Sequence, residues 1–274
     1  MTAVRKPAVA GLFYPSDPRA LKAQLDALFA GVPMTPAAVP KAIIAPHAGY
    51  IYSGAIAATA YARLKAARAE IRRVVLLGPA HRVGFRGLAG TSAVHFETPL
   101  GRVPVDTEAL AAIADLPQVC VLDQAHAQEH SLEVHLPFLQ TLFDDFTLVP
   151  LAVGDASPAE VGEVIERLWG GPARRVATPN EIGSDTLVVV SSDLSHYHPY
   201  AVAQALDQAT SRAIERLRYE DIEYDHACGR APINGLLYVA RRRGMTAQTV
   251  DLRSSGDTAG PRDQVVGYGA YVFH

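Results

Sequence analysis

The sequence predicts a single α/β domain with a central, mostly parallel or mixed sheet flanked by helices. Several apolar runs are continuous rather than alternating, which is typical of strands that are covered on both faces. These runs alternate along the chain with longer stretches of helical periodicity. No linker or change in composition divides the 274 residues. We therefore expect one domain over residues 1–274.

Four continuous apolar runs are the predicted buried strands of this sheet. In chain order they are KAIIAPHAGY (41–50), RRVVLLGPAH (72–81), FTLVPLAVG (146–154) and TLVVVSSDLSH (186–196). A Thr-Pro-Leu-Gly turn between two short runs predicts a hairpin over residues 93–106. The C-terminal segments TAQTVDLRS and VVGYGAYVF are predicted to be closing strands.

Helices are predicted between these strands from apolar periodicity and capping residues. Ser53 is a candidate N-cap for the helix after the first strand, and Asp155 or Ser157 for the helix that ends near Trp169. Further helical patterns lie in TEALAAIA, in SLEVHLPFLQTLF and over about 200–243, with a short run, VCVLD, among them. The Gly- and Pro-containing segment 170–186 is predicted to be a surface loop.

Composition excludes several classes of function. The chain has 25 Lys and Arg against 28 Asp and Glu, a formal net charge of −3, which gives no basic footprint for nucleic acid or an anionic membrane. No apolar stretch is long enough to span a bilayer, and the N-terminal residues lack the apolar core of a signal peptide. Because two cysteines cannot form a disulfide framework, we expect a reducing, cytoplasmic environment.

Candidate functional side chains follow three of the four predicted buried strands. His47 follows the first strand, His81 the second, and Asp193 and His196 follow the fourth. In doubly wound α/β folds, ligands bind at the carboxyl ends of the strands, so we expect these side chains to share one edge of the sheet. Imidazole nitrogens that converge there suit zinc, copper or iron.

The segment EHSLEVHLPFL (129–139) offers further candidates but is not the helix of a zinc protease. The protease motif HExxH places its histidines four residues apart, whereas His130 and His135 are five apart, which separates them by about 140° on an ideal helix. At most one of the two should face a given site. His130 is open to a functional or a structural interpretation, and His135 is predicted to be a partly exposed helix residue.

The two cysteines have different predicted roles. Cys120 lies inside the run VCVLD and is predicted to be a small core residue. Cys228 lies at a polar, Gly-containing junction before an apolar helix, where a thiol is suited to bind a metal. Sequence spacing does not place Cys228 relative to the histidines.

Seven short motifs, in the same order, resemble those of the Memo family of cell-motility mediators, whose bacterial members are also called AmmeMemoRadiSam system protein B. They are AVAGLFYP (8–15), APHAGYIYSG (45–54), LLGPAHR (76–82), ETPLG (97–101), EHSLEVHLPFL (129–139), SSDLSHY (191–197) and CGRAPI (228–233). The resemblance covers nearly the whole chain. It implies the fold of the LigB-like subunits of class III extradiol dioxygenases, which are non-haem iron enzymes that cleave catechol rings.

The resemblance also implies roles for six residues. They are the metal ligands His47, His81 and Cys228, and the pocket residues Asp193, His196 and His130. The dioxygenases have Glu as their third ligand, whereas Memo-like chains, and this one, have Cys. A thiolate favours softer or redox-active copper and changes the potential of iron, so the difference argues against ring cleavage and leaves metal binding in place. Ser195 replaces a cysteine of the family.

Two classes of function fit these residues. The first is a metal-dependent oxidoreductase that uses iron or copper, O₂ and an organic small molecule. In it, His196 would be a general acid/base oriented by Asp193, and His130 would stabilise a bound oxygen species. The second is a non-catalytic module that binds a peptide or partner and retains the metal cleft. Zinc-dependent hydrolysis is a further alternative, because His and Cys also bind zinc.

Overall fold

The computed structural model describes residues 3–33, 38–169 and 185–274, and the strands in these ranges form two sheets. The strands are β1 (Val4–Arg5), β2 (Ala42–Ala45), β3 (Arg73–Pro79), β4 (Leu88–Gly90), β5 (His95–Thr98), β6 (Gly101–Pro104), β7 (Val119–Val121), β8 (Thr147–Val153), β9 (Thr186–Ser191), β10 (His196–His198), β11 (Ala247–Ser254) and β12 (Val265–Phe273). The larger sheet has the order β10-β12-β2-β9-β3-β8-β4-β7, with β11 paired to β12. The smaller sheet has the order β1-β5-β6.

The larger sheet is parallel at its centre and antiparallel towards its edges. Strands β2, β9, β3 and β8 run parallel to one another, and they are the four predicted buried strands. Strand β12 is antiparallel to β2, and β4 is antiparallel to β8. The prediction of an α/β domain with a mostly parallel or mixed sheet is therefore confirmed. The predicted hairpin is also present, as β5 and β6.

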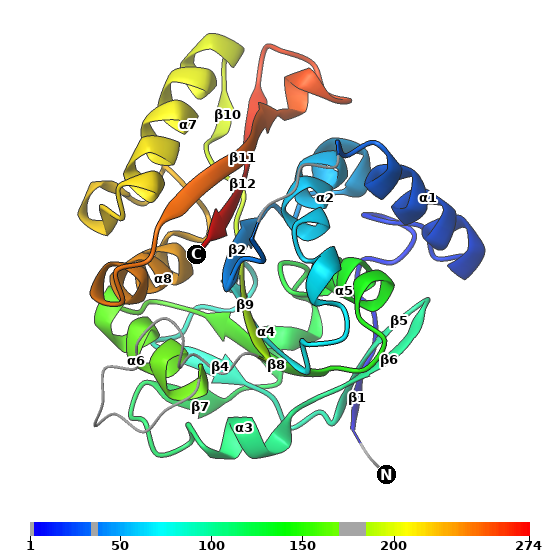
Figure 1. Cartoon of the computed structure of the whole chain (residues 1–274), viewed down its shortest axis with the longest axis vertical. Coiled ribbons are helices and arrows are strands. Elements are labelled where there is room, and N and C mark those ends of the chain that lie inside the picture. Colours follow the sequence, from blue (N-terminus) through cyan, green and yellow to red (C-terminus); the bar gives the residue numbers. More distant parts are fainter. Residues whose placement is uncertain (1–2, 34–37, 170–184) are drawn as a thin grey trace.

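Helices cover both faces of the larger sheet (Figure 1). They are α1 (Pro18–Ala30), α2 (Ala55–Ala62), α3 (Thr107–Ala111), α4 (Gln124–Ala127), α5 (Leu136–Leu142), α6 (Pro158–Leu168), α7 (Tyr200–Glu215) and α8 (Arg230–Arg242). Helices α1, α2 and α5 lie on one side, and α6, α7 and α8 on the other (Figure 1). Shorter helices are η1 (Tyr50–Gly54), η2 (Lys65–Ala67), η3 (Glu133–His135), η5 (Tyr219–Asp221) and η6 (Ser255–Asp257).

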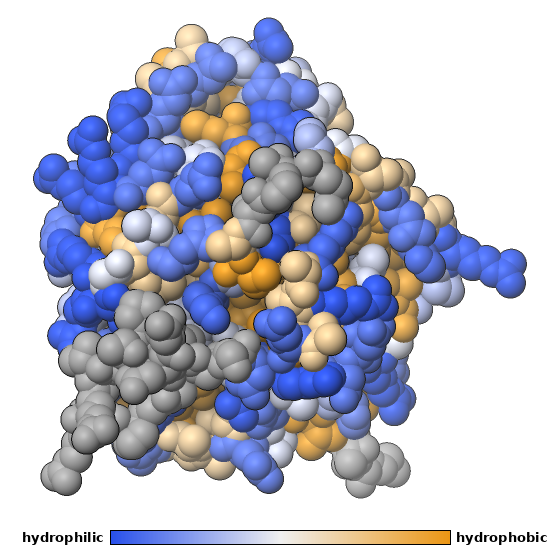
Figure 2. Space-filling model, viewed as in Figure 1, coloured by the Kyte–Doolittle hydropathy of each residue, from blue (hydrophilic) through white to orange (hydrophobic). Residues whose placement is uncertain are grey.

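Alternate residues of the central strands belong to two separate hydrophobic cores. Ile43 and Val189 pack in the core under α1, α2 and α5, whereas Ile44 and Val190 pack in the core under α6 and α8. Successive strand residues point to opposite faces, so a strand buried on both faces needs apolar side chains at every position. In the view of Figure 1, hydrophobic residues gather towards the middle of the molecule and hydrophilic ones cover most of its rim (Figure 2).

Two local predictions are wrong. Ser53 is not an N-cap, because the chain first forms the π-helix η1 and α2 then starts at Ala55; the Ser53 hydroxyl donates to Ala48 O instead. Cys120 is exposed rather than in the core, because β7 is an edge strand that pairs only with β4.

Other local predictions are confirmed or lie outside the described chain. Ser157 caps α6 in a capping box with Glu160. The predicted helix over SLEVHLPFLQTLF divides into η3 and α5, with Pro137 in the first turn of α5, where a missing N–H does no harm. Residues 170–184 of the predicted loop lie outside the described residues. None of the described helices is long and apolar enough to cross a membrane.

Candidate metal centre

Three neighbouring parallel strands end beside one another and deliver the predicted strand-end residues to one edge. His47 lies two residues after β2, His81 two residues after β3, and Asp193 two residues after β9, which pairs with both other strands. Because parallel strands present their carboxyl ends at the same edge, residues 34 and 112 positions apart become neighbours. The rings of His47 and His81 lie 5.2 Å apart, centroid to centroid.

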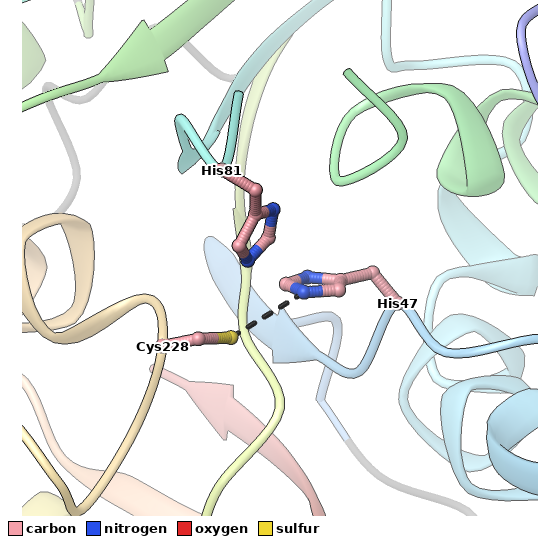
Figure 3. A group of neighbouring side chains, drawn as sticks. All are labelled: His47, His81 and Cys228. Carbon is pink, nitrogen blue, oxygen red and sulfur yellow. Dashed lines mark hydrogen bonds between the residues drawn. The ribbon is translucent and has the colours of Figure 1, made fainter. Parts of the chain in front are cut away.

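Cys228 approaches the same edge from the loop before α8. The approach depends on Gly229, where a Cβ atom would lie 2.5 Å from Ser191 O and 2.6 Å from the Ser192 Cβ. Cys228 Sγ consequently lies 3.4 Å from His47 Nε2 and 3.6 Å from Asp193 O. Figure 3 shows His47, His81 and Cys228 pointing towards a common point from three different segments.

One potential ligand atom from each of His47, His81 and Cys228 lies within 4.8 Å of the other two. Two imidazole nitrogens and a sulfur are a donor set that suits copper, iron or zinc. The three side chains therefore fit the metal site that the sequence resemblance implied. A second group within the described residues, His81, Glu129 and His130, meets the same distance limit.

Burial sets the protonation of the candidate ligands. His47 is buried, and desolvation, followed by the nearby His81 and His130, holds its pKa well below the ordinary value. The imidazole is therefore neutral and keeps a lone pair for a metal. Burial and then the charge of Asp193 raise the pKa of the Cys228 thiol. Since a metal ligand must be a thiolate, metal binding at Cys228 would release a proton.

Hydrogen bonds behind the histidines fix their orientation. His47 Nδ1 lies 2.6 Å from Ser191 Oγ, and His81 Nδ1 lies 2.9 Å from Glu129 Oε1. Burial alone would raise the pKa of Glu129, but hydrogen bonds from His81 and from the Ser131 backbone lower it to about 2. Glu129 is therefore an ionised carboxylate that is almost fully buried.

Asp193 and His196 lie beside the candidate ligands. The sequence predicted that Asp193 orients the ring of His196, but the two side chains have other hydrogen-bond partners. Asp193 Oδ1 accepts a hydrogen bond from His47 N at 2.8 Å. The Nδ1 of His196 lies 2.7 Å from Leu194 O, so a backbone carbonyl, rather than Asp193, orients this ring. Burial raises the pKa of Asp193 to about 7 and lowers that of His196.

The two histidines of the segment 129–139 are separated as the spacing predicts, but His135 is not exposed. His130 stacks on His81 with centroids 4.8 Å apart, and burial lowers its pKa to about 4. His135 is buried in η3, where its Nδ1 lies 2.9 Å from the Tyr61 hydroxyl. The prediction of a partly exposed His135 is wrong because the chain forms a tight 3₁₀ turn that packs on α2.

A cavity of about 1090 Å³ opens over these side chains. All six predicted site residues line it, namely His47, His81, His130, Asp193, His196 and Cys228. Tyr197, Arg82, Phe85 and Arg230 also line the cavity. The structure therefore brings together every residue singled out by the resemblance, in a space large enough for a small organic molecule.

Asp207 of α7 holds the loop that carries Asp193 and His196. It is almost fully buried, and its Oδ1 accepts a hydrogen bond from Ser195 N at 3.0 Å. Next to this loop, Tyr197 of β10 has a positive φ of 60°, which is unusual for a bulky residue. Burial raises the pKa of Asp207 from 3.8 to about 6, although hydrogen bonds from Ser195 oppose the shift.

Asp207→Asn is expected to change how the stability of the protein depends on pH. Since the folded chain holds the Asp207 proton more tightly than the unfolded chain, this group makes the free energy of unfolding fall as pH rises from about 4 to about 6. The variant should lack this component, on the order of 1–3 kcal/mol. Urea unfolding of both metal-free proteins between these pH values measures the difference, and parallel profiles would contradict the prediction.

Several functional residues were not assigned a role from the sequence. Glu129 was visible only as an acid in a His-rich segment, and Ser131, Ser191 and Gly229 gave no signal of their own. Their roles depend on contacts between residues 37 to 144 positions apart, which no local pattern contains. The motif pairs CG (228–229) and SS (191–192) are the nearest available signal, because small residues permit close approach of two segments.

Comparison with known proteins identifies relatives along the whole chain. The model of the Memo-like protein family matches residues 5–272. A MEMO1 family protein of Saccharolobus solfataricus is 37% identical over 288 residues, covering 98% of this chain and 99% of that protein. A MEMO1 family protein of Metallosphaera sedula is 34% identical over 286 residues, again covering 98% of this chain and 99% of that protein.

Proposed function

This chain belongs to the Memo-like protein family, and from that premise we propose that it binds one iron or copper ion through His47, His81 and Cys228 for redox chemistry on a small organic molecule. The observation that supports this proposal is the convergence of the three ligand atoms, within 4.8 Å of one another, at the wall of a cavity of about 1090 Å³. Iron or copper held there would supply one-electron chemistry and open positions for O₂ and substrate.

The protein's own residues would bind the substrate and move protons. His196 has a lowered pKa and directs Nδ1 to Leu194 O, so its Nε2 is the atom that takes a proton from a substrate hydroxyl. Asp193, with a pKa raised to about 7, is suited to hold a proton near neutral pH. His130, stacked on His81 and neutral, would contribute a polar group that stabilises O₂ in the cavity.

Metal analysis of protein purified without chelators tests the metal site. We expect iron or copper in the wild type, and its loss in Cys228→Ser, because the hydroxyl of serine is a poor replacement for a thiolate ligand. Cys120→Ser is the matched control, since Cys120 is the other cysteine and is exposed on β7. Metal that persists in Cys228→Ser, or a wild type that binds neither ion on reconstitution, would refute the assignment.

Oxygen uptake distinguishes an oxidoreductase from a binding module. The Fe(II)-loaded protein, prepared anaerobically, should consume O₂ in the presence of a catechol or a quinol, and His196→Ala should slow that consumption by about 10²–10⁴-fold if its ring transfers a proton. A metal-loaded protein that consumes no O₂ with either class of compound would overturn the oxidoreductase proposal.

A peptide-binding module is the second candidate function. Tyr197 and Tyr224 line the cavity, yet 69% and 86% of their surfaces are exposed, and exposed aromatic residues beside a cleft are typical of recognition surfaces. In this case, we expect the metal to persist without O₂ consumption.

Both functions need Cys228 as a reduced thiol, so we propose that the protein works in a reducing compartment such as the cytoplasm.

Zinc-dependent hydrolysis is a further alternative. A zinc ion bound by His47, His81 and Cys228 would indicate it.

A further inference from the structure

The segment 129–131 supplies hydrogen-bond acceptors behind both ligand histidines. Glu129 Oε1 lies 2.9 Å from His81 Nδ1, and Glu129 Oε2 accepts from His81 N at 2.6 Å. Glu129 Oε1 also accepts from the backbone N of His130 and of Ser131, each at 2.9 Å. Hydrogen bonds from three backbone N–H groups favour the ionised carboxylate. Because an ionised carboxylate has no proton to donate, His81 Nδ1 must carry the proton of its bond to Glu129.

The contact behind His47 leads to the same conclusion by a different route. Ser191 Oγ donates to Ser131 O at 2.6 Å, and a hydroxyl has a single proton to donate. At 2.6 Å from His47 Nδ1, Ser191 Oγ can therefore only accept. His47 Nδ1 must carry the proton, which leaves a lone pair on Nε2, the atom that faces Cys228 Sγ.

The segment is held against the ends of the strands that carry the ligands. Ser131 Oγ donates to Pro79 O of β3 at 2.8 Å. Gly78 permits this packing, because a Cβ atom there would lie 2.8 Å from Ser131 Oγ and 3.1 Å from Ser191 Cβ. The position of the segment is thus set by the same strand that leads to His81.

We propose that residues 129–131 fix both ligand imidazoles in the Nδ1–H tautomer, so that their Nε2 lone pairs are aimed at the metal position before an ion binds. The carboxylate of Glu129 sets His81, and the carbonyl of Ser131, acting through the Ser191 hydroxyl, sets His47. This inference rests on the proposed metal site. It makes Glu129 and Ser191 positioning residues whose partners orient metal ligands, a role that typically changes metal affinity by about 10–100-fold.

An alternative use of the same residues is a second metal ion held by His81, Glu129 and His130. The distances permit it, but the hydrogen bonds oppose it. Glu129 Oε1 already accepts two backbone N–H groups, Oε2 accepts a third, and His81 Nδ1 presents a proton rather than a lone pair. An ion there would compete with these donors within a buried site, where a backbone N–H group that loses its acceptor is costly.

Nitrogen-15 NMR of the histidine rings tests the proposal on the metal-free protein at neutral pH. In the wild type, we expect His47 and His81 to be Nδ1–H tautomers. Glu129→Gln should reduce the Nδ1–H population of His81 and leave His47 unchanged. The reason is that the glutamine side chain has an NH₂ donor in place of one of the two carboxylate oxygens that accept. Ser191→Ala should do the reverse. Each variant should still bind one ion, with affinity lower by about 10–100-fold.

Two matched controls separate positioning from a loss of folding. Asp106→Asn changes another largely buried carboxylate that accepts a backbone N–H group, at the start of α3 and away from the cavity. Ser211→Ala removes a buried hydroxyl that bonds Tyr271. Both should lower the unfolding temperature without changing either tautomer.

Three outcomes would overturn the proposal. They are Nε2–H tautomers in the wild type, unchanged tautomers in Glu129→Gln and Ser191→Ala, and loss of one of two bound ions in Glu129→Gln. The proposed function fails separately, if the wild type binds no metal. In that case the tautomers of the metal-free protein still decide whether residues 129–131 orient the two rings.

Discussion

Replacing His47 with alanine is expected to abolish stoichiometric metal binding while leaving the protein folded. The substitution removes one of three potential ligand atoms that converge within 4.8 Å, so the loss in affinity should exceed the 100-fold or so that is typical when a residue hydrogen-bonded to a metal ligand is changed. The ring borders an open cavity and makes two side-chain hydrogen bonds, with Ser191 and with Cys228. Its removal should therefore lower the free energy of unfolding by about 1–3 kcal/mol.

Metal titration and urea unfolding of the same preparation measure the two effects. His198→Ala is the matched control, because His198 lines the same cavity but does not belong to either group of potential ligands. It should bind metal with wild-type stoichiometry. If His47→Ala still holds one ion per chain, the ligand assignment is wrong. If the variant unfolds, the loss of metal says nothing by itself, and Cys228→Ser at the cavity wall then decides.

The central sheet was predictable because a strand that is buried on both faces has a continuous run of apolar residues in the sequence. Strand β3 has no polar residue between Val74 and Pro79, and such a run can only be covered on both sides. The parallel direction of the strands was also predictable, because helical segments separate the apolar runs along the chain. Element starts were less predictable. At Ser53, a strong capping residue lies inside a π-helix, where its hydroxyl donates to the carbonyl of Ala48 five residues earlier and does not cap the following helix.

The residues of the candidate site that lie just after strand ends were predictable, and the others were not. His47, His81 and Asp193 are placed by a general property of parallel sheets. Cys228 was assigned only through the resemblance to a family, because its approach depends on Gly229 packing against Ser191 and Ser192, a contact without any local signal.

Hydrogen-bond partners were the least predictable part of the site. Asp193 was expected to orient His196, but it bonds the backbone of His47, and Leu194 O takes the histidine proton. A side chain two or three residues away in sequence competes with backbone carbonyls that are already in position, and only the folded geometry decides between them.

Replacing Arg5 with alanine is expected to destabilise the protein by about 3–5 kcal/mol, because it leaves a buried negative charge without its positive partner. Arg5 is 8% exposed, and it pairs with Glu133, which is fully buried. Its guanidinium also bonds the backbone oxygens of His126 and Glu129. Without Arg5, Glu133 keeps hydrogen bonds from Tyr14 and from the backbone of Ala8 and Val9 but loses its counter-charge.

Lys6→Ala is a matched control for this prediction, since Lys6 is the next residue and also pairs with a glutamate. Its side chain is 66% exposed where it meets Glu97, so its removal should change the free energy of unfolding by at most about 1 kcal/mol. Adding Glu133→Gln to Arg5→Ala removes the unpaired buried charge and should recover part of the lost stability, which a double-mutant cycle measures. Equal effects of Arg5→Ala and Lys6→Ala in urea unfolding would contradict the prediction. Since Arg5 also holds Glu129 O, the same pair anchors the segment that we propose orients the candidate metal ligands.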